Sequence, residues 1–250
     1  MGKAASKSEC RDIQRLYATA LTARGKHHRA KRLVDCVLQD EKKEATGYRT
    51  WRCQHRNCLF CCWKYWRTFI ENYLRKIKRL TRNDYRLSFL TLTIPNVPSL
   101  SPELYRELAA DLKKLMRRYP FKCRVVGAVA RIETDFNPHS QDFHIHIHII
   151  LIYSQCIPQK EIVEAWTDVM GPHLNVYELS DMPGRESKPC VVWIEKIKPG
   201  TLRKIVRYVF KFEPFEDAEA FAEYDCAVRN VRLVQSFGAL FERNRKARRH

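Results

Sequence analysis

Hydrophobic positions along the chain fall into two kinds of pattern, and these predict where helices and strands lie. Stretches in which apolar residues recur every three or four positions predict helices, here at residues 8–23, 63–80, 101–118, 158–169 and 199–212. Runs rich in β-branched and aromatic residues predict strands, here at residues 87–94, 124–134, 143–153, 173–179, 190–196 and 231–235. The Lys/Arg/His run at residues 24–32 is expected to be loosely ordered.

The order of these segments indicates the fold class. Helices interrupt the strands without strict alternation, which is typical of α+β proteins. A short polar loop separates the strands expected at residues 124–134 and 143–153, so those two should form a hairpin. We therefore expect an α+β fold with a central, mostly antiparallel sheet of about five strands flanked by helices. A small, basic helical region should precede it.

The distribution of charge points to a polyanionic partner. The 250 residues carry 46 basic and 28 acidic side chains, a formal net charge of +18. Residues 1–82 hold 21 Lys/Arg against 7 Asp/Glu, and residues 243–250 hold five basic residues and no acidic one. The stretch between them, residues 83–242, is nearly neutral. Basic flanks around a neutral centre predict phosphate contacts with nucleic acid, and we expect domains at 1–82, 83–242 and 243–250.

The sequence also bears on where the protein acts. No stretch approaches the roughly 20 apolar residues that a membrane-spanning helix needs, and the first six residues lack the hydrophobic centre of a secretory signal. We interpret the chain as a cytoplasmic protein without a membrane partner.

A cluster of cysteines follows the first helices and has the spacing of a metal site. Cysteines at positions 53, 58 and 61 give the pattern C-x4-C-x2-C, and a fourth lies upstream at position 36. Four thiolates hold Zn²⁺ in a closed tetrahedral site. The expected ligands are Cys36, Cys53, Cys58 and Cys61. Cys62 and His55 are alternatives for the fourth ligand, and disulfides are disfavoured in a reducing cytosol.

A second metal site is indicated by the segment His-Ile-His-Ile-His at residues 144–148. Side chains alternate along a strand, so one face carries isoleucines and the other carries His144, His146 and His148. Alternate histidines lie about 7 Å apart, so the pair that binds one ion is either 144/146 or 146/148. Glu133, across the hairpin, can add a carboxylate. Two imidazoles and a carboxylate suit Mg²⁺ or Mn²⁺ with positions left for a substrate. A solvent-facing row of histidines is the alternative.

A nucleophile is offered by the helix expected at residues 199–212. Tyr208 and Lys211 are three residues apart and would share one helix face. A phenol has an unperturbed pKa of about 10, so a nearby cation favours the phenolate that attacks. A tyrosine and a lysine at this spacing are common, so we single out this pair only because the strand expected at residues 143–153 (the histidine strand) predicts a metal site.

The order of these motifs resembles the rolling-circle replication initiators of plasmids, within the HUH endonucleases. Residues 89–96 (Phe-Leu-Thr-Leu-Thr-Ile-Pro-Asn) are similar to their first motif, residues 143–151 to the metal motif and residues 208–211 to the tyrosine motif. Residues 232–238 resemble the closing segment of the branch found on small staphylococcal plasmids. The resemblance covers roughly residues 36 to 240, including a cysteine segment before the first motif.

The resemblance implies a specific chemistry. Tyr208 would attack the DNA backbone and leave a 5′-phosphotyrosyl enzyme with a free 3′-hydroxyl, Lys211 would help electrostatically, and His146 and His148 would be the metal pair. The DNA would be single-stranded or supercoiled plasmid DNA. No helicase-type phosphate loop is present, so a host helicase and polymerase are expected partners.

One position departs from that pattern. The plasmid branch has a glutamate one helical turn before the tyrosine, where this chain has Lys204. Termination would then use another carboxylate, such as Glu195 or Glu213, or a different scheme. Two other functions remain open: a single-strand DNA transposase of the same chemistry, and a non-catalytic, zinc-dependent DNA-binding regulator.

Overall fold

The computed structural model describes residues 6–46, 53, 55–82, 84–177, 192–211 and 214–241. The chain divides into two compact units, one formed by Met1–Phe69 with Lys211–Arg229 and the other by Ile70–Phe210 with Asn230–His250. The domains expected from charge, at 1–82, 83–242 and 243–250, stay a prediction. Among the described helices, none has the length and apolar character needed to cross a membrane.

The first unit is helical. It contains α1 (Lys7–Ala23), α2 (His27–Thr46), α8 (Ala218–Ala227) and the first turns of α3 (Leu59–Thr81). Ser6 caps α1 in a capping box with Glu9, which satisfies exposed N–H groups at the helix start. Tyr17 of α1 stacks on Phe221 of α8 at a ring-centroid distance of 3.5 Å. Two segments far apart in the sequence therefore share one small core.

The expected disorder at residues 24–32 is wrong, because α2 begins within that run at His27. Leu33 and Val37 are 0% and 1% exposed, so one side of this helix is core. Arg29 forms an ion pair with the buried Asp225, and Asp225 also accepts a hydrogen bond from the Asn57 side chain at 2.7 Å. The basic composition of the run hid an amphipathic helix whose charges are partly used in packing.

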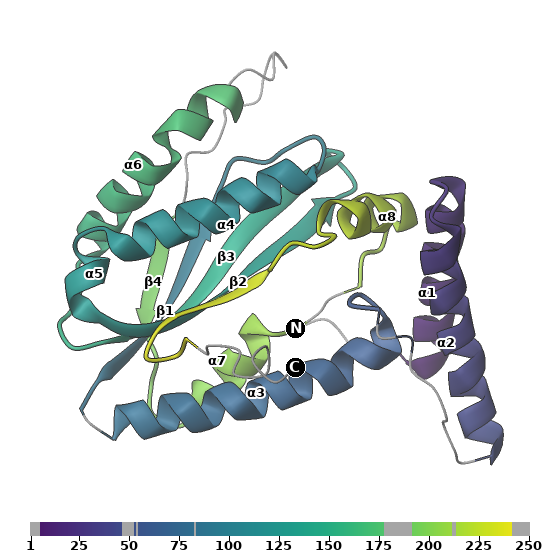
Figure 1. Cartoon of the computed structure of the whole chain (residues 1–250), viewed down its shortest axis with the longest axis horizontal. Helices are drawn as coiled ribbons and strands as arrows, with labels where there is room; N and C mark the ends of the chain where they lie inside the picture. Colours follow the sequence, from purple (N-terminus) through teal and green to yellow (C-terminus); the bar gives the residue numbers. More distant parts are fainter. Residues whose placement is uncertain are drawn as a thin grey trace, which may run out of the picture. The chain divides into compact units, whose positions relative to one another are not determined.

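The second unit is built on a five-stranded sheet, which confirms the predicted α+β class. Its strands are β1 (Arg86–Thr93), β2 (Val125–Asn137), β3 (Asp142–Tyr153), β4 (Val192–Lys196) and β5 (Val234–Gly238). They lie in the order β4-β1-β3-β2-β5, and every neighbouring pair is antiparallel (Figure 1). The expected hairpin is the β2–β3 pair at the centre of the sheet.

Helices cover both faces of this sheet. α4 (Pro102–Arg117) and α6 (Gln159–Tyr177) lie on the same face (Figure 1), over buried residues such as Leu92 and Ile147. The short helix α5 (Phe121–Arg124) follows α4. The opposite face carries the histidines of β3, and α7 (Leu202–Val209) packs there. The isoleucine face of β3 is thus covered by α4 and α6 and the histidine face by α7, as the alternation of side chains along β3 predicts.

Several predicted boundaries change. The strand expected at residues 173–179 is wrong, because α6 continues to Tyr177; positions 178 and 179 lie outside the described residues. The helix expected at residues 199–212 ends earlier, at Val209. The last strand begins at Val234 instead of residue 231. α5 and α8 were not expected, and the predicted basic tail at 243–250 lies outside the described residues.

Candidate metal and nucleophile sites

The histidine face of the sheet is ordered by the register of three strands. His146 pairs with Glu133 of β2 on one side and with Thr93 of β1 on the other. His148 pairs with Arg131 and Thr91 in the same way. Directly paired residues on one face lie closest together across a sheet, so register alone brings the predicted carboxylate next to a predicted histidine.

Glu133, His146 and His148 form a group that can hold a metal ion. One ligand atom from each lies within 4.8 Å of the others. The Nε2 atom of His148 is 3.0 Å from a carboxylate oxygen of Glu133, yet this buried nitrogen has no hydrogen bond of acceptable geometry. A ring nitrogen this close to a carboxylate oxygen, with no hydrogen bond between them, suits two ligands of one cation. The residues present therefore fit a divalent ion.

The other nitrogen of His148 is held from β1. Thr91 Oγ1 lies 3.1 Å from His148 Nδ1. A hydrogen bond at the far nitrogen fixes the orientation of a metal-binding imidazole. Thr91 belongs to the predicted first motif, so that motif lies beside the histidines of β3 in the sheet.

Asp135 was not predicted as a site residue. Its carboxylate lies 2.9 Å from His146 Nε2, and its pKa is lowered: burial raises it, but the hydrogen bond from His146 and the nearby histidine charges outweigh burial. Its place two residues after Glu133, hence on the same face of β2, is the signal that could have found it. His144 pairs with Asp135 in register and lies outside the three-residue group.

Tyr208 of α7 lies over the same face. Its ring centroid is 5.1 Å from that of His148 and 5.8 Å from that of Phe89. The side chain is still 48% exposed, so a substrate can reach it. Burial and the charges of Glu133 and Asp135 raise the pKa of the phenol. A cation among those carboxylates would act in the opposite direction and favour phenolate.

Buried contacts hold α7 in this place. Arg131, 4% exposed on the histidine face, donates a hydrogen bond from Nη1 to the carbonyl oxygen of Val209 at 3.0 Å. Phe210, which follows the helix, stacks on Tyr73 at 5.4 Å. A cation at the C-terminus of a helix also interacts favourably with its dipole. The sheet thereby positions the residue that precedes Val209, which is Tyr208.

The cysteine cluster belongs to the first unit and gathers as predicted. Cys36 of α2 and the three cysteines of the C-x4-C-x2-C pattern (the knuckle cysteines) are all buried, and their sulfur atoms lie within 4.8 Å of one another. Three of the Sγ–Sγ distances are 3.4, 3.5 and 3.6 Å. Four sulfurs at the Zn–S distance of about 2.3 Å in a tetrahedron are about 3.8 Å apart. The four residues therefore fit a zinc ion, and Cys36 is part of the group.

Comparison with known proteins gives the family. A model of the family described as "Replication protein" matches residues 45–250. The chain belongs to this replication protein family. A relative from Staphylococcus aureus named "Protein rep" is 28% identical over 153 residues, which cover 56% of this chain and 63% of the relative. Another "Protein rep", from Streptococcus pneumoniae serotype 2 (strain D39 / NCTC 7466), is 27% identical over 112 residues, 42% of this chain and 34% of the relative.

Each alignment thus spans less than two thirds of the relative's length. No solved structure gives a match. The predicted resemblance to plasmid replication initiators is confirmed at the level of the family. The matched segment contains the histidine strand, the tyrosine helix and the three knuckle cysteines, while Cys36 lies before it.

In this member of the replication protein family, the two alternative zinc ligands have other partners. His55 accepts a hydrogen bond from the Asn57 amide at its Nδ1 atom, and its Nε2 lies 3.5 Å from Asp225. Cys62 has its Sγ 3.6 Å from the carbonyl oxygen of Leu59. Neither belongs to the four-cysteine group.

The remaining predicted residues of this replication protein are less closely placed. Lys211 follows the end of α7, so the expected helix face shared by Tyr208 and Lys211 is wrong; its role as helper stays a prediction. Lys204 is exposed on α7, and Glu195 is exposed on β4 in register with Phe89. Glu213 lies outside the described residues.

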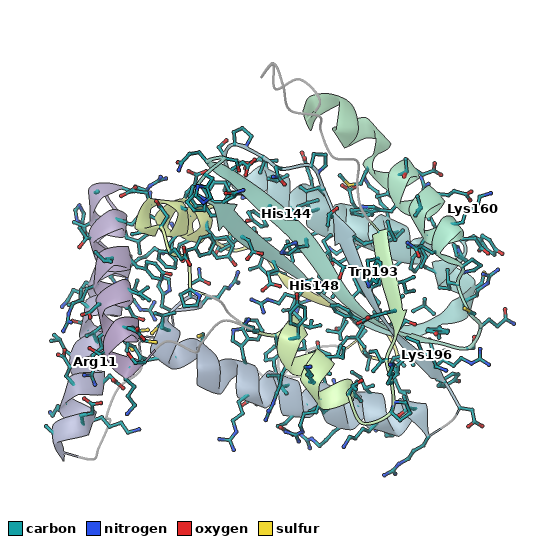
Figure 2. All side chains as sticks on the ribbon, turned by 180° about the vertical axis from the view of Figure 1, so that it is seen from behind. Arg11, His144, His148, Lys160, Trp193 and Lys196 are labelled. Carbon is teal, nitrogen blue, oxygen red and sulfur yellow. The ribbon has the colours of Figure 1, made fainter. Side chains whose placement is uncertain are left out.

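Trp193 was also missed by the sequence analysis. It is 60% exposed on β4 and pairs with Thr91, which in turn pairs with His148. Paired residues point to the same face, so this indole stands two strands away from the metal ligands, and Figure 2 labels both His148 and Trp193. A large exposed aromatic side chain in this place suits stacking with an unpaired base.

Proposed function

We propose that this chain initiates DNA replication by nicking one strand with Tyr208. The observation that carries the proposal is the Tyr208 ring over His148, which itself belongs to a Glu133–His146–His148 group. A nucleophile beside a metal group on a rigid sheet suits the transfer of a phosphodiester, because the reacting groups are held in place and a cation can activate the attacking oxygen. Membership of the replication protein family supports the same reading.

The reaction follows from what each residue can do. Mg²⁺ or Mn²⁺ held by Glu133, His146 and His148 would polarise the scissile phosphate and favour phenolate. The Tyr208 oxygen forms a bond to phosphorus, and the bond from phosphorus to the 3′-oxygen breaks. That oxygen takes up a proton and leaves as a 3′-hydroxyl able to prime synthesis, while the 5′-phosphate stays on Tyr208. Attack by a 3′-hydroxyl reverses the step and rejoins DNA.

The substrate we propose is single-stranded or supercoiled plasmid DNA at an origin. The formal charge of +18 favours a polyanion, and Trp193 offers a base-stacking surface on the nicking face. Lys211 is retained as an electrostatic helper, and Glu195 or Glu213 as the carboxylate of the terminating step. A host helicase would unwind the duplex and a host polymerase would extend the new 3′ end.

A covalent-adduct assay tests the proposal. The protein is incubated with a labelled library of single-stranded oligonucleotides and Mn²⁺, and adducts are resolved on a denaturing gel. We expect an adduct that Tyr208→Phe abolishes and that the control Tyr85→Phe retains, because Tyr85 lies before β1 and outside the site. An adduct that still forms in Tyr208→Phe would refute the proposal that Tyr208 is the nucleophile. Binding without any adduct would favour a zinc-dependent DNA-binding regulator.

A further inference from the structure

The second unit carries a groove on the other side of the sheet from the histidines. It lies between α4 and β5, and its volume is about 650 Å³. Residues 232–238, the closing segment that the nicking proposal leaves without a role, form much of its wall. We propose that this groove is a second DNA site, which binds a single strand separately from the nicking face.

The charge of the groove suits a phosphate backbone. Its cationic lining residues are Arg106, Lys113, Arg117 and Arg232, and no Asp or Glu lines it. The first three lie seven and four residues apart on α4, which places them on one stripe of the helix. Arg106 forms an ion pair with Glu103. For Lys113, Arg117 and Arg232, the described residues provide no ion pair.

The neighbouring cations of α4 behave differently. Lys114 pairs with Asp111 at 2.8 Å, and Arg118 pairs with Asp168 at 3.0 Å. Neither lines the groove. Of the cations that line the groove, Lys113, Arg117 and Arg232 thus have no ion pair among the described residues, whereas Lys114 and Arg118 beside them are paired within the protein. This contrast within one helix argues for an anionic occupant.

Aromatic side chains specify a single strand. Phe237 and Phe241 line the groove, and Phe241 is 53% exposed. Phe237 pairs in register with Ala128, whose side chain lies on the face covered by α4. Aromatic rings beside a cationic track are typical of single-strand binding, because every unpaired base has a face to stack. A paired duplex offers no such face inside a groove of this size.

The register separates this site from the nicking site. Gln235 donates a hydrogen bond from its side chain to the carbonyl oxygen of Ala109 in α4, so the odd-numbered residues of β5 face α4. Arg131, which pairs with Val234, faces the histidine side. A second hollow of about 470 Å³ continues the groove past Arg117 and Phe237 and adds Lys122. A bound strand therefore has a path along the edge of the sheet.

Anisotropy titration of the full chain tests the inference. The probe is a fluorescein-labelled 12-nucleotide oligothymidylate, with no divalent cation added so that no strand is cut. We expect Lys113→Gln with Arg117→Gln to weaken binding on the order of tenfold and to reduce the slope of log K against log salt by about 1.4, since each lost phosphate contact removes about 0.7. We expect Phe241→Ala to weaken binding about 5- to 140-fold, and Phe241→Trp to restore it.

The matched control is Arg118→Gln with Lys160→Gln, which removes the same charge from ion-paired positions of the same unit. It should bind the probe as the unaltered protein does. Equal losses in control and groove variants would overturn the inference, and so would unchanged binding by the groove variants. If a duplex of the same length bound with equal affinity and the groove variants lost that binding, the occupant of the groove would be a duplex, and the inference of a single strand would be overturned. The groove variants should still form the Tyr208 adduct at saturating DNA. The adduct assay therefore tests the proposed nicking function, and the anisotropy titration tests the groove.

Discussion

At the scale of single residues, the three histidines of β3 are alike in sequence but differ in their neighbours. His146 and His148 lie with Glu133 in one group of ligand atoms, whereas His144 pairs with Asp135 nearer the end of the strand. His148 is also the most enclosed, at 4% exposure, and is oriented by Thr91. Its loss should therefore affect metal binding most.

Replacing His148 by Ala should abolish Mn²⁺ binding at this site and reduce adduct formation by at least about a hundredfold. The expected magnitude follows from loss of a ligand, since loss of partners beyond the ligands already costs 10- to 100-fold. The matched control His144→Ala should retain binding within a few fold. Isothermal titration with Mn²⁺ measures both. Loss of Mn²⁺ binding in His144→Ala, with binding retained in His148→Ala, would show that the ligand pair is 144/146.

At the scale of elements, the sheet and α7 are connected by a buried cation. The hydrogen bond from Arg131 to the Val209 carbonyl links the centre of β2 to the end of the helix that bears Tyr208. A charged hydrogen bond of this kind is worth about 1.5–3 kcal/mol. Arg131 would thus position Tyr208, the proposed nucleophile.

Arg131→Met should lower the rate of adduct formation on the order of tenfold, because α7 would lose its anchor while the metal group remains. Mn²⁺ affinity should change little, which separates positioning from metal binding. Single-turnover adduct kinetics with parallel titration of the metal provide the measurement. A rate that matches the unaltered protein would contradict this role.

The end of β5 depends on a glycine. Gly238 has φ of +56°, and a Cβ atom there would lie 2.3 Å from the carbonyl oxygen of Val126. Ala239 donates its N–H to that same oxygen, so the backbone approach is part of the strand pairing. Only glycine allows both features.

Gly238→Ala should destabilise the protein by about 1–3 kcal/mol, because backbone strain and the clash act together. Gly171→Ala is the contrasting variant: it lies in α6, and a Cβ there meets nothing within 4 Å. It should be neutral or stabilising by up to about 1 kcal/mol. Thermal and urea unfolding measure the change in stability of both variants. Equal changes would show that the close approach of Gly238 to Val126 does not affect stability.

At the scale of the whole molecule, the first unit has a small core. Its helices surround the four-cysteine group, in which Cys36 comes from α2 and Cys61 from the start of α3. Structural zinc sites contribute on the order of 10 kcal/mol to folding in small domains. Removal of the metal should thus unfold this unit before the sheet.

Metal analysis should find one zinc ion per chain, which Cys36→Ser removes and Cys62→Ser retains. Strong chelation should abolish hydrogen-exchange protection in α2 while β3 stays protected, because β3 belongs to the second unit. Protection of α2 that persists without zinc would show that packing alone holds the unit, and zinc loss with Cys62→Ser would assign a different fourth ligand.

Much of the fold could be read from local patterns. The alternation at residues 144–148 gave the two faces of β3, and Ser101-Pro102 located the start of α4 through its cap. The strand expected at 173–179 is wrong because a short apolar run does not distinguish a strand from the continuation of a helix, and α6 continues to Tyr177. The run at 24–32 failed because charge obscured the spacing of buried residues in α2.

The sequence by itself determined the chemistry that the chain can carry: which residues are imidazoles, thiols and phenols, and which of them share a face of one element. Periodicity is local, so these facts need no tertiary contact. The tertiary structure decided which partners meet. Strand register placed His146 and His148 beside Glu133 and brought Asp135 and Trp193 to the same face, because pairing between strands depends on contacts distant in sequence. Buried contacts of α7 placed Tyr208 over His148.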